Sequence, residues 1–82
     1  MDSNEQMNTV KKALVRMEIE HSESEFQVPL SFDAPKTGIV ATVPKIHFGV
    51  LSLILSMLPN VRTTALGKTE TGESEKFGFY TS

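Results

Sequence analysis

The chain has 82 residues, a formal net charge of −2 and no cysteine. A chain of this length makes one domain at most, and residues 1–82 are predicted to form a single small domain. The lack of cysteine excludes disulfides and thiolate metal sites. Because so small a core supplies only about 3–5 kcal/mol of net stability, we expect a partner subunit to add to it.

No segment has the pattern typical of a targeting or membrane-spanning sequence. The N-terminus is polar and acidic, unlike a secretory signal peptide. The uncharged run from Ile46 to Leu58 is shorter than the ~20 residues that span a bilayer. We therefore expect a cytoplasmic, intracellular protein without a membrane span.

The first predicted element is a helix over residues 4–17. Ser3 would cap its N-terminus, and Gln6, three residues on, would complete a capping box. An apolar stripe follows at spacings of three and four residues: Met7, Val10, Leu14 and Met17. Residues 18–25 are polar and acidic, and we expect a solvated connection there.

Strict alternation of apolar and polar residues then predicts a half-buried strand over residues 26–33. Its apolar face would hold Phe26, Val28, Leu30 and Phe32. Pro29 cannot donate a ladder hydrogen bond, so this strand is expected at a sheet edge or with a bulge. Turn residues lead into a β-branched strand over residues 39–43, which we expect to pair with the first strand as a hairpin.

The second half of the chain repeats the order helix, strand, strand. Pro44 and Pro59 bracket a predicted helix over residues 45–58. The remaining predicted elements are a strand at 61–66, a turn at 71–74 and a strand at 76–80. The order α-β-β-α-β-β predicts a small α+β fold, with an antiparallel four-stranded sheet and helices packed on it.

The helix predicted over residues 45–58 has more apolar surface than one sheet covers. Its small and polar residues fall on one narrow stripe: Lys45, Gly49, Ser52 and Ser56. Three arrangements fit this pattern. The helix lies between the sheet and the first helix with the stripe in water, or it packs against its own copy in a homodimer, or it docks on a membrane surface. Helices that dock on membranes usually carry several lysine or arginine residues on the polar face, and this one has Lys45 alone. For self-association we predict the interface residues Phe48, Leu51, Leu55 and Leu58.

The densest group of charged side chains is acidic and comprises Glu18, Glu20, Glu23 and Glu25, with His21 among them. Their spacing matches no EF-hand loop, so we interpret them as a partner-facing acidic surface and predict neither a metal site nor a cofactor. The chain has no nucleophile elbow, P-loop, dinucleotide fingerprint or zinc-protease motif. We therefore predict that it is not an enzyme.

A nucleic-acid interface is the alternative function. Between Ala34 and Thr69 the chain has no acid, and its cations there are Lys36, Lys45, Arg62 and Lys68. The last predicted strand carries the aromatic residues Phe77, Phe79 and Tyr80, which would stack bases. The cations are sparse, acidic segments flank them, and Phe77 and Phe79 are more simply explained as core residues.

The sequence thus favours a small non-enzymatic binding protein, such as a regulator, an inhibitor or an accessory subunit. The expected partner is another protein or a second copy of the chain in a homodimer. This interpretation rests on the missing catalytic motifs and on the surplus apolar surface of the helix over residues 45–58.

Overall fold

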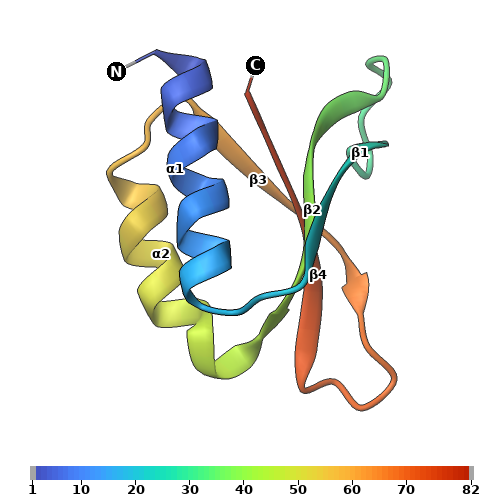
Figure 1. The fold of residues 1–82 in the computed structure, drawn as a ribbon. Helices are drawn as coiled ribbons and strands as arrows, with labels where there is room; N and C mark the ends of the chain where they lie inside the picture. The colour runs from blue at the N-terminus through green and yellow to red at the C-terminus, as the bar shows by residue number, and fades with distance from the viewer. Residues whose placement is uncertain (1, 82) are drawn as a thin grey trace.

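The computed structural model describes residues 2–81 and shows two helices beside a four-stranded antiparallel sheet (Figure 1). Its elements are α1 (Ser3–Arg16), β1 (His21–Phe26), β2 (Lys36–Pro44), the 3-10 turn η1 (Lys45–His47), α2 (Phe48–Ser56), β3 (Val61–Lys68) and β4 (Ser74–Thr81). The order α-β-β-α-β-β confirms the predicted α+β fold class.

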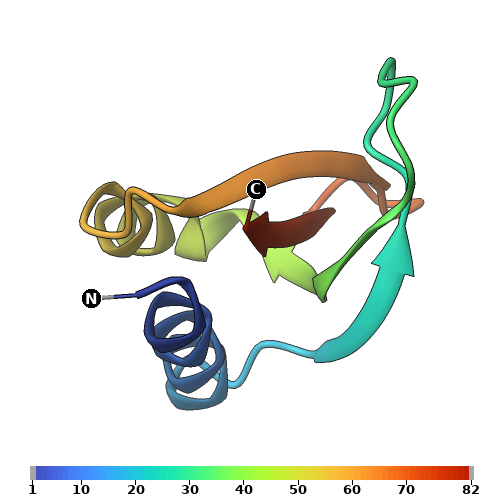
Figure 2. The same cartoon turned by 90° about the horizontal axis from the view of Figure 1, so that it is seen from above.

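The sheet has the strand order β1-β2-β4-β3, and every neighbouring pair is antiparallel. β2 and β3 therefore run in the same direction on either side of β4, and α2 makes the connection between them. Both helices lie on one face of the sheet, as the view from above shows (Figure 2). The described residues leave the opposite face without a helix, and β1 and β3 form the two edges.

The core forms where the inward side chains of β2 and β4 meet α1. Ile39 of β2 lies opposite Phe79 of β4. Two residues along, Ala41 lies opposite Phe77, so these side chains share the face toward the helices. Phe79 and Leu14 of α1 are fully buried in this cluster. The prediction that Phe77 and Phe79 share one face is confirmed.

The sequence predicted Ser3 as the N-cap of α1, but the residue that caps this helix is Asp2. A carboxylate oxygen of Asp2 accepts a hydrogen bond from the backbone N–H of Glu5 at 2.8 Å. The buried Gln6 side chain accepts a hydrogen bond from the backbone N–H of Asn60 at 2.8 Å. This second bond ties the start of α1 to the connection that precedes β3.

Asp2→Ala is expected to lower the free energy of unfolding by about 1 kcal/mol, because α1 loses an acceptor for its first N–H groups. Ser3→Ala is the matched control and is expected to have a smaller effect. Urea unfolding of both variants measures the difference. A loss in Ser3→Ala that equals or exceeds the loss in Asp2→Ala would contradict this assignment of the cap.

The predicted strand over residues 26–33 is wrong. β1 instead occupies the segment expected to be a solvated connection, and of the four predicted inward residues Phe26 alone is buried. Leu30 and Phe32 are fully exposed in the segment between β1 and β2. Polar residues can form β1 because an edge strand is held by the backbone ladder of its neighbour. β2 does pair with the preceding strand in antiparallel fashion, but that strand is β1 and not the predicted segment.

The remaining elements agree with the sequence, with shifted ends. The structure confirms the strands predicted at 39–43, 61–66 and 76–80 and the helices predicted at 4–17 and 45–58. The second helix is shorter than predicted because its first turn is the 3-10 turn η1.

Candidate interaction surface

α2 carries no charged residue and is attached to the fold along one narrow face. Leu51 is 4% exposed, and Leu58, just beyond the helix, is 3% exposed. These two residues lie about two helical turns apart, which places them on the same side of the helix. α2 therefore meets the core along this line, and much of its remaining circumference faces outward.

Four large apolar side chains form an exposed row on the outer side of η1 and α2. We call this row the α2 ridge, and it consists of Ile46, Val50, Leu53 and Met57. Their exposed fractions are 85%, 53%, 69% and 72%. Spacings of three and four residues place them on one helical face. Contiguous exposed apolar side chains are typical of interaction surfaces, so the α2 ridge is a candidate for one.

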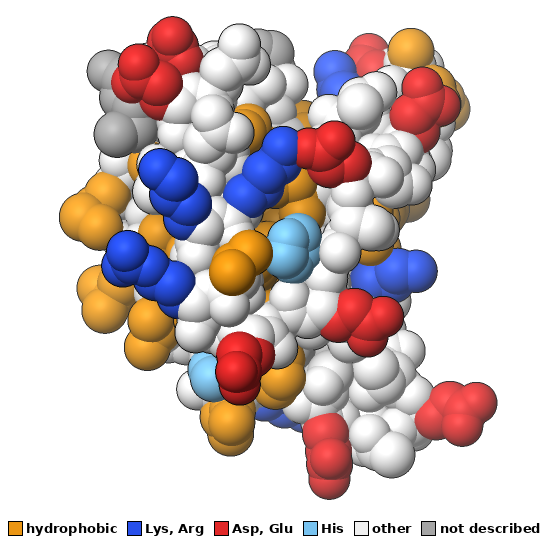
Figure 3. Space-filling model, in the orientation of Figure 1, with side chains coloured by type: hydrophobic (Ala, Val, Ile, Leu, Met, Phe, Trp, Pro, Cys, Tyr) orange, Lys and Arg blue, Asp and Glu red, His pale blue; other side chains and the backbone are white. Residues whose placement is uncertain are grey.

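A groove between α1 and α2 borders the ridge. It encloses about 350 Å³, with Ala13, Met17 and Ile54 in its apolar lining and Lys12 and Arg16 beside them. In the space-filling view, hydrophobic side chains gather on the α2 side of the molecule next to the basic side chains of α1 (Figure 3). The apolar surface therefore continues from the ridge into this groove and ends at a basic border.

Three of the four interface residues predicted from the sequence lie on the inner half of α2, and Leu58 lies just beyond its end. Leu51 and Leu58 are buried in the chain's own core, which leaves them almost no surface for a partner. Phe48 and Leu55 are half-buried. The ring of Phe48 meets that of Phe77 edge-on, with 5.5 Å between the ring centroids. Phe48, Leu51 and Leu55 also line a second groove of about 370 Å³, between α2 and β3.

The predicted acidic surface follows one edge of the sheet. Glu20, Glu23 and Glu25 are exposed in β1 or just before it, and Glu18 is exposed in the turn after α1. Glu23 forms an ion pair with Lys11 of α1. The hydrogen bond from Lys11, together with its positive charge, holds the pKa of Glu23 below the usual glutamate value. β1 is therefore a negatively charged edge, and such charges oppose the addition of another strand.

Lys11→Met is expected to raise the pKa of Glu23 toward its usual value. A carboxyl with a lowered pKa adds stability above its unfolded-state pKa and loses that contribution as the pH falls through the folded-state value. The contribution is small because both side chains are solvent-exposed. An NMR pH titration checks the shift, with Lys12→Met as the control on the same helix. An unchanged pKa of Glu23 in Lys11→Met would show that the ion pair does not persist in solution.

The four cations of the nucleic-acid alternative are spread over the fold. Lys36 begins β2 and Lys45 follows its end, so this strand of 9 residues separates them by about 30 Å. Arg62 and Lys68 lie toward opposite ends of β3. The cations therefore form no compact basic patch.

The aromatic residues of β4 divide between the two faces of the sheet. Phe79 is fully buried and Phe77 is half-buried on the helix face, so neither presents a ring for base stacking. Tyr80 lies on the opposite face, edge-on to Phe26 with 5.8 Å between ring centroids. Phe26 in turn covers Gly78, where an added Cβ would lie 2.6 Å from the ring. These positions do not favour the nucleic-acid alternative.

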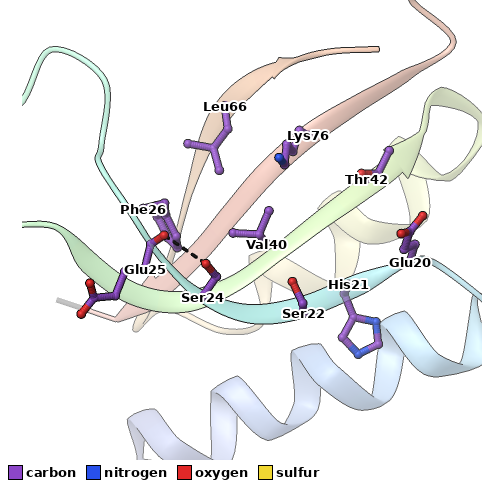
Figure 4. A pocket seen from close by; sticks show the side chains of 10 residues that line it. All are labelled: Glu20, His21, Ser22, Ser24, Glu25, Phe26, Val40, Thr42, Leu66 and Lys76. Atoms are coloured by element: carbon purple, nitrogen blue, oxygen red, sulfur yellow. Dashed lines mark hydrogen bonds between the residues drawn. The ribbon is translucent and has the colours of Figure 1, made fainter.

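The sheet face without helices carries a hollow of about 380 Å³ (Figure 4). Val40, Phe26 and Leu66 supply its apolar lining. Lys76 and Glu20 lie around it together with serine and threonine hydroxyls. A lining that mixes both charge signs with hydroxyl and apolar groups selects no single class of ligand.

Comparison with known proteins adds no information on the function of the α2 ridge. No protein-family model, no curated protein and no solved structure matches the chain. Within residues 2–81, no group of three or more histidine, aspartate or glutamate side chains is placed to hold a metal ion. The same residues contain no helix with the length and apolar character needed to cross a membrane.

Proposed function

We propose that the protein is a small non-enzymatic binding protein that acts through protein–protein contacts made by the α2 ridge. The observation that carries the proposal is the exposure of four large apolar side chains in one row. Burial of each such side chain is worth about 1.5–3 kcal/mol. A partner that covers the ridge therefore gains substantial free energy for so small a protein.

The first partner in this proposal is a second copy of the chain, giving a homodimer in which α2 packs against α2. In a two-fold contact the same surface meets itself, so an uncharged surface avoids contact between like charges. From Ile46 to Met57 the chain has no Asp, Glu, Lys or Arg. Apart from its chain neighbours and the nearby backbone of α2, no atom lies within 4 Å of the Cβ position of Gly49, which leaves room for a facing helix. Lys12 and Arg16 stay at the border of the contact, where solvent screens their charge.

A regulator, an inhibitor or an accessory subunit would use a surface of this kind. The cysteine-free composition suits a reducing compartment, and we place the protein in the cytoplasm as part of the proposal.

Sedimentation velocity over a range from low-micromolar to millimolar protein tests the proposal. The mean mass is expected to rise with concentration from that of one chain toward twice that value. A chain that sediments as a monomer over the whole range would contradict the homodimer.

A further inference from the structure

β3 offers a free sheet edge without the acidic charges that protect the opposite edge. Among the described residues β3 pairs with β4 alone, so the backbone groups on its outer side have no ladder partner. β1 carries exposed glutamates, whereas β3 has no acid. The cations of β3, Arg62 and Lys68, stand toward its two ends, and residues 63–65 between them are small and uncharged. An extended chain can therefore approach the middle of β3.

The α2–β3 groove lies beside this edge. Its lining comes from Phe48, Leu51, Ser52, Leu55, Thr63, Phe77 and Phe79. None of these side chains is charged, and the groove holds about 370 Å³. It stays open because the inward side chains of β3 are short. Thr63 and Ala65, which lie opposite the two phenylalanines of β4, are still exposed.

We propose that β3 and the α2–β3 groove bind an extended segment of a partner protein by strand addition. The backbone of the segment pairs with the free edge of β3, and every second side chain points over the groove. Those side chains are apolar, because the groove is lined mainly by Leu and Phe side chains. A carboxylate at one end of the segment faces Arg62, and a carboxylate at the other end faces Lys68, whose cross-strand neighbour on β4 is Glu75.

The positions of the two cations set the length of the bound segment. Arg62 and Lys68 are six residue steps apart, or about 20 Å along an extended strand, which matches a peptide of about seven residues. A bulge between Ala65 and Gly67 interrupts the register of β3 with β4. Bulges bend the strand that holds them, so the main contact lies at residues 61–65.

The probe is a synthetic heptapeptide of the sequence Glu-Val-Thr-Val-Thr-Val-Glu, titrated into the full chain and followed by amide NMR spectra. We expect saturable shifts at residues 61–65 and at Phe48 and Ser52, with a dissociation constant in the millimolar range or below. Two further peptides are N-methylated on alternate residues. One carries the methyl groups on the odd-numbered residues and the other on the even-numbered residues. One of them is expected to lose binding and the other to retain it, because alternate backbone groups of a strand face the same edge. Lysine at both peptide ends is expected to weaken binding about two- to fivefold.

Two serines of α2 provide matched variants. Ser52 lines the groove and Ser56 does not, and both are exposed. Ser52→Phe fills the groove and is expected to weaken peptide binding at least tenfold, whereas Ser56→Phe leaves it unchanged. The double variant Leu53→Glu/Met57→Glu of the ridge is expected to bind the peptide as the unmodified chain does, which separates this site from the proposed homodimer.

Three results would overturn strand addition at β3. The first is the absence of saturable shifts with the heptapeptide, because the main-chain hydrogen bonds that give affinity do not depend on its sequence. The second is equal binding by both N-methylated peptides. The third is pairing of β3 with β3 of a second copy, which would fill the site in the free protein.

Discussion

Replacing both Leu53 and Met57 with glutamate is expected to dissociate the proposed homodimer. The two substitutions remove exposed apolar side chains from the α2 ridge and place carboxylates where the two copies meet. A buried apolar side chain is worth about 1.5–3 kcal/mol and two are lost from each copy, so the dissociation constant should rise at least about a thousandfold. Sedimentation velocity, at a concentration where the unmodified chain is dimeric, measures the change.

Val15→Glu is the matched control for this variant. Val15 is an apolar side chain that is 63% exposed, but it lies on α1 outside the ridge. Its replacement adds one carboxylate to each copy, half the charge of the double variant, and should leave the dissociation constant nearly unchanged. Circular dichroism of both variants establishes that each is folded. A Leu53→Glu/Met57→Glu variant that is folded and still dimeric would exclude the ridge as the interface.

Gly38→Ala is expected to have the largest effect on stability. β2 passes so close to β4 at this position that an added Cβ would collide with the backbone carbonyl oxygen of Phe79. Backbone atoms in the middle of a sheet cannot move aside without disturbing the ladder. Overpacking in such a place costs about 1–3 kcal/mol, and more where the neighbour is rigid. The denaturant midpoint, followed by circular dichroism, measures the loss.

Gly49→Ala is the control, and its effect on the free energy of unfolding should have the opposite sign. Gly49 lies exposed in α2, and apart from its chain neighbours and the nearby helix backbone no atom lies within 4 Å of its Cβ position. Alanine there raises helix propensity and is expected to stabilise the chain by up to about 1 kcal/mol. A neutral Gly38→Ala would show that β2 and β4 lie farther apart in solution than in this structure.

Elements with a regular apolar period were predictable from the sequence. Val10 and Leu14, one turn apart, mark the buried face of α1, and both are fully buried. The alternation of Ile39, Ala41 and Val43 marks β2, and all three side chains are buried. In these segments the local pattern and the tertiary packing agree, because each segment buries one face against a large neighbour.

β1 could not be predicted from an apolar period. Its sequence, His-Ser-Glu-Ser-Glu-Phe, contains one apolar residue, and the strand is held by backbone pairing with β2. The apolar alternation from Phe26 to Phe32 pointed to the wrong segment. Leu30 and Phe32 pack against no neighbour in the core, and Pro29 lies in the same stretch. An apolar pattern predicts a strand only where another element is present to cover it.

The apolar character of the helix at 45–58 was predictable from the sequence, and the side of that helix that is exposed was not. The surplus apolar surface of this helix is visible in the sequence, but two of the predicted interface residues, Leu51 and Leu58, face the core. The available signal was the position of Ile46 and Leu53 beside the small polar stripe, because residues next to an exposed stripe tend to be exposed too. The direction in which a helix faces its sheet depends on packing with α1 and β4, which no local pattern contains.

The ridge itself can be tested most directly by isotope-filtered NMR on a mixture of labelled and unlabelled chains. In such a sample, proton contacts between labelled and unlabelled partners arise only across an interface. We expect contacts between copies at the methyl groups of Ile46, Val50, Leu53 and Met57. A dimer whose intermolecular contacts lie along β1 or β3, or a chain with no such contacts at millimolar concentration, would contradict the α2 ridge as the site of self-association.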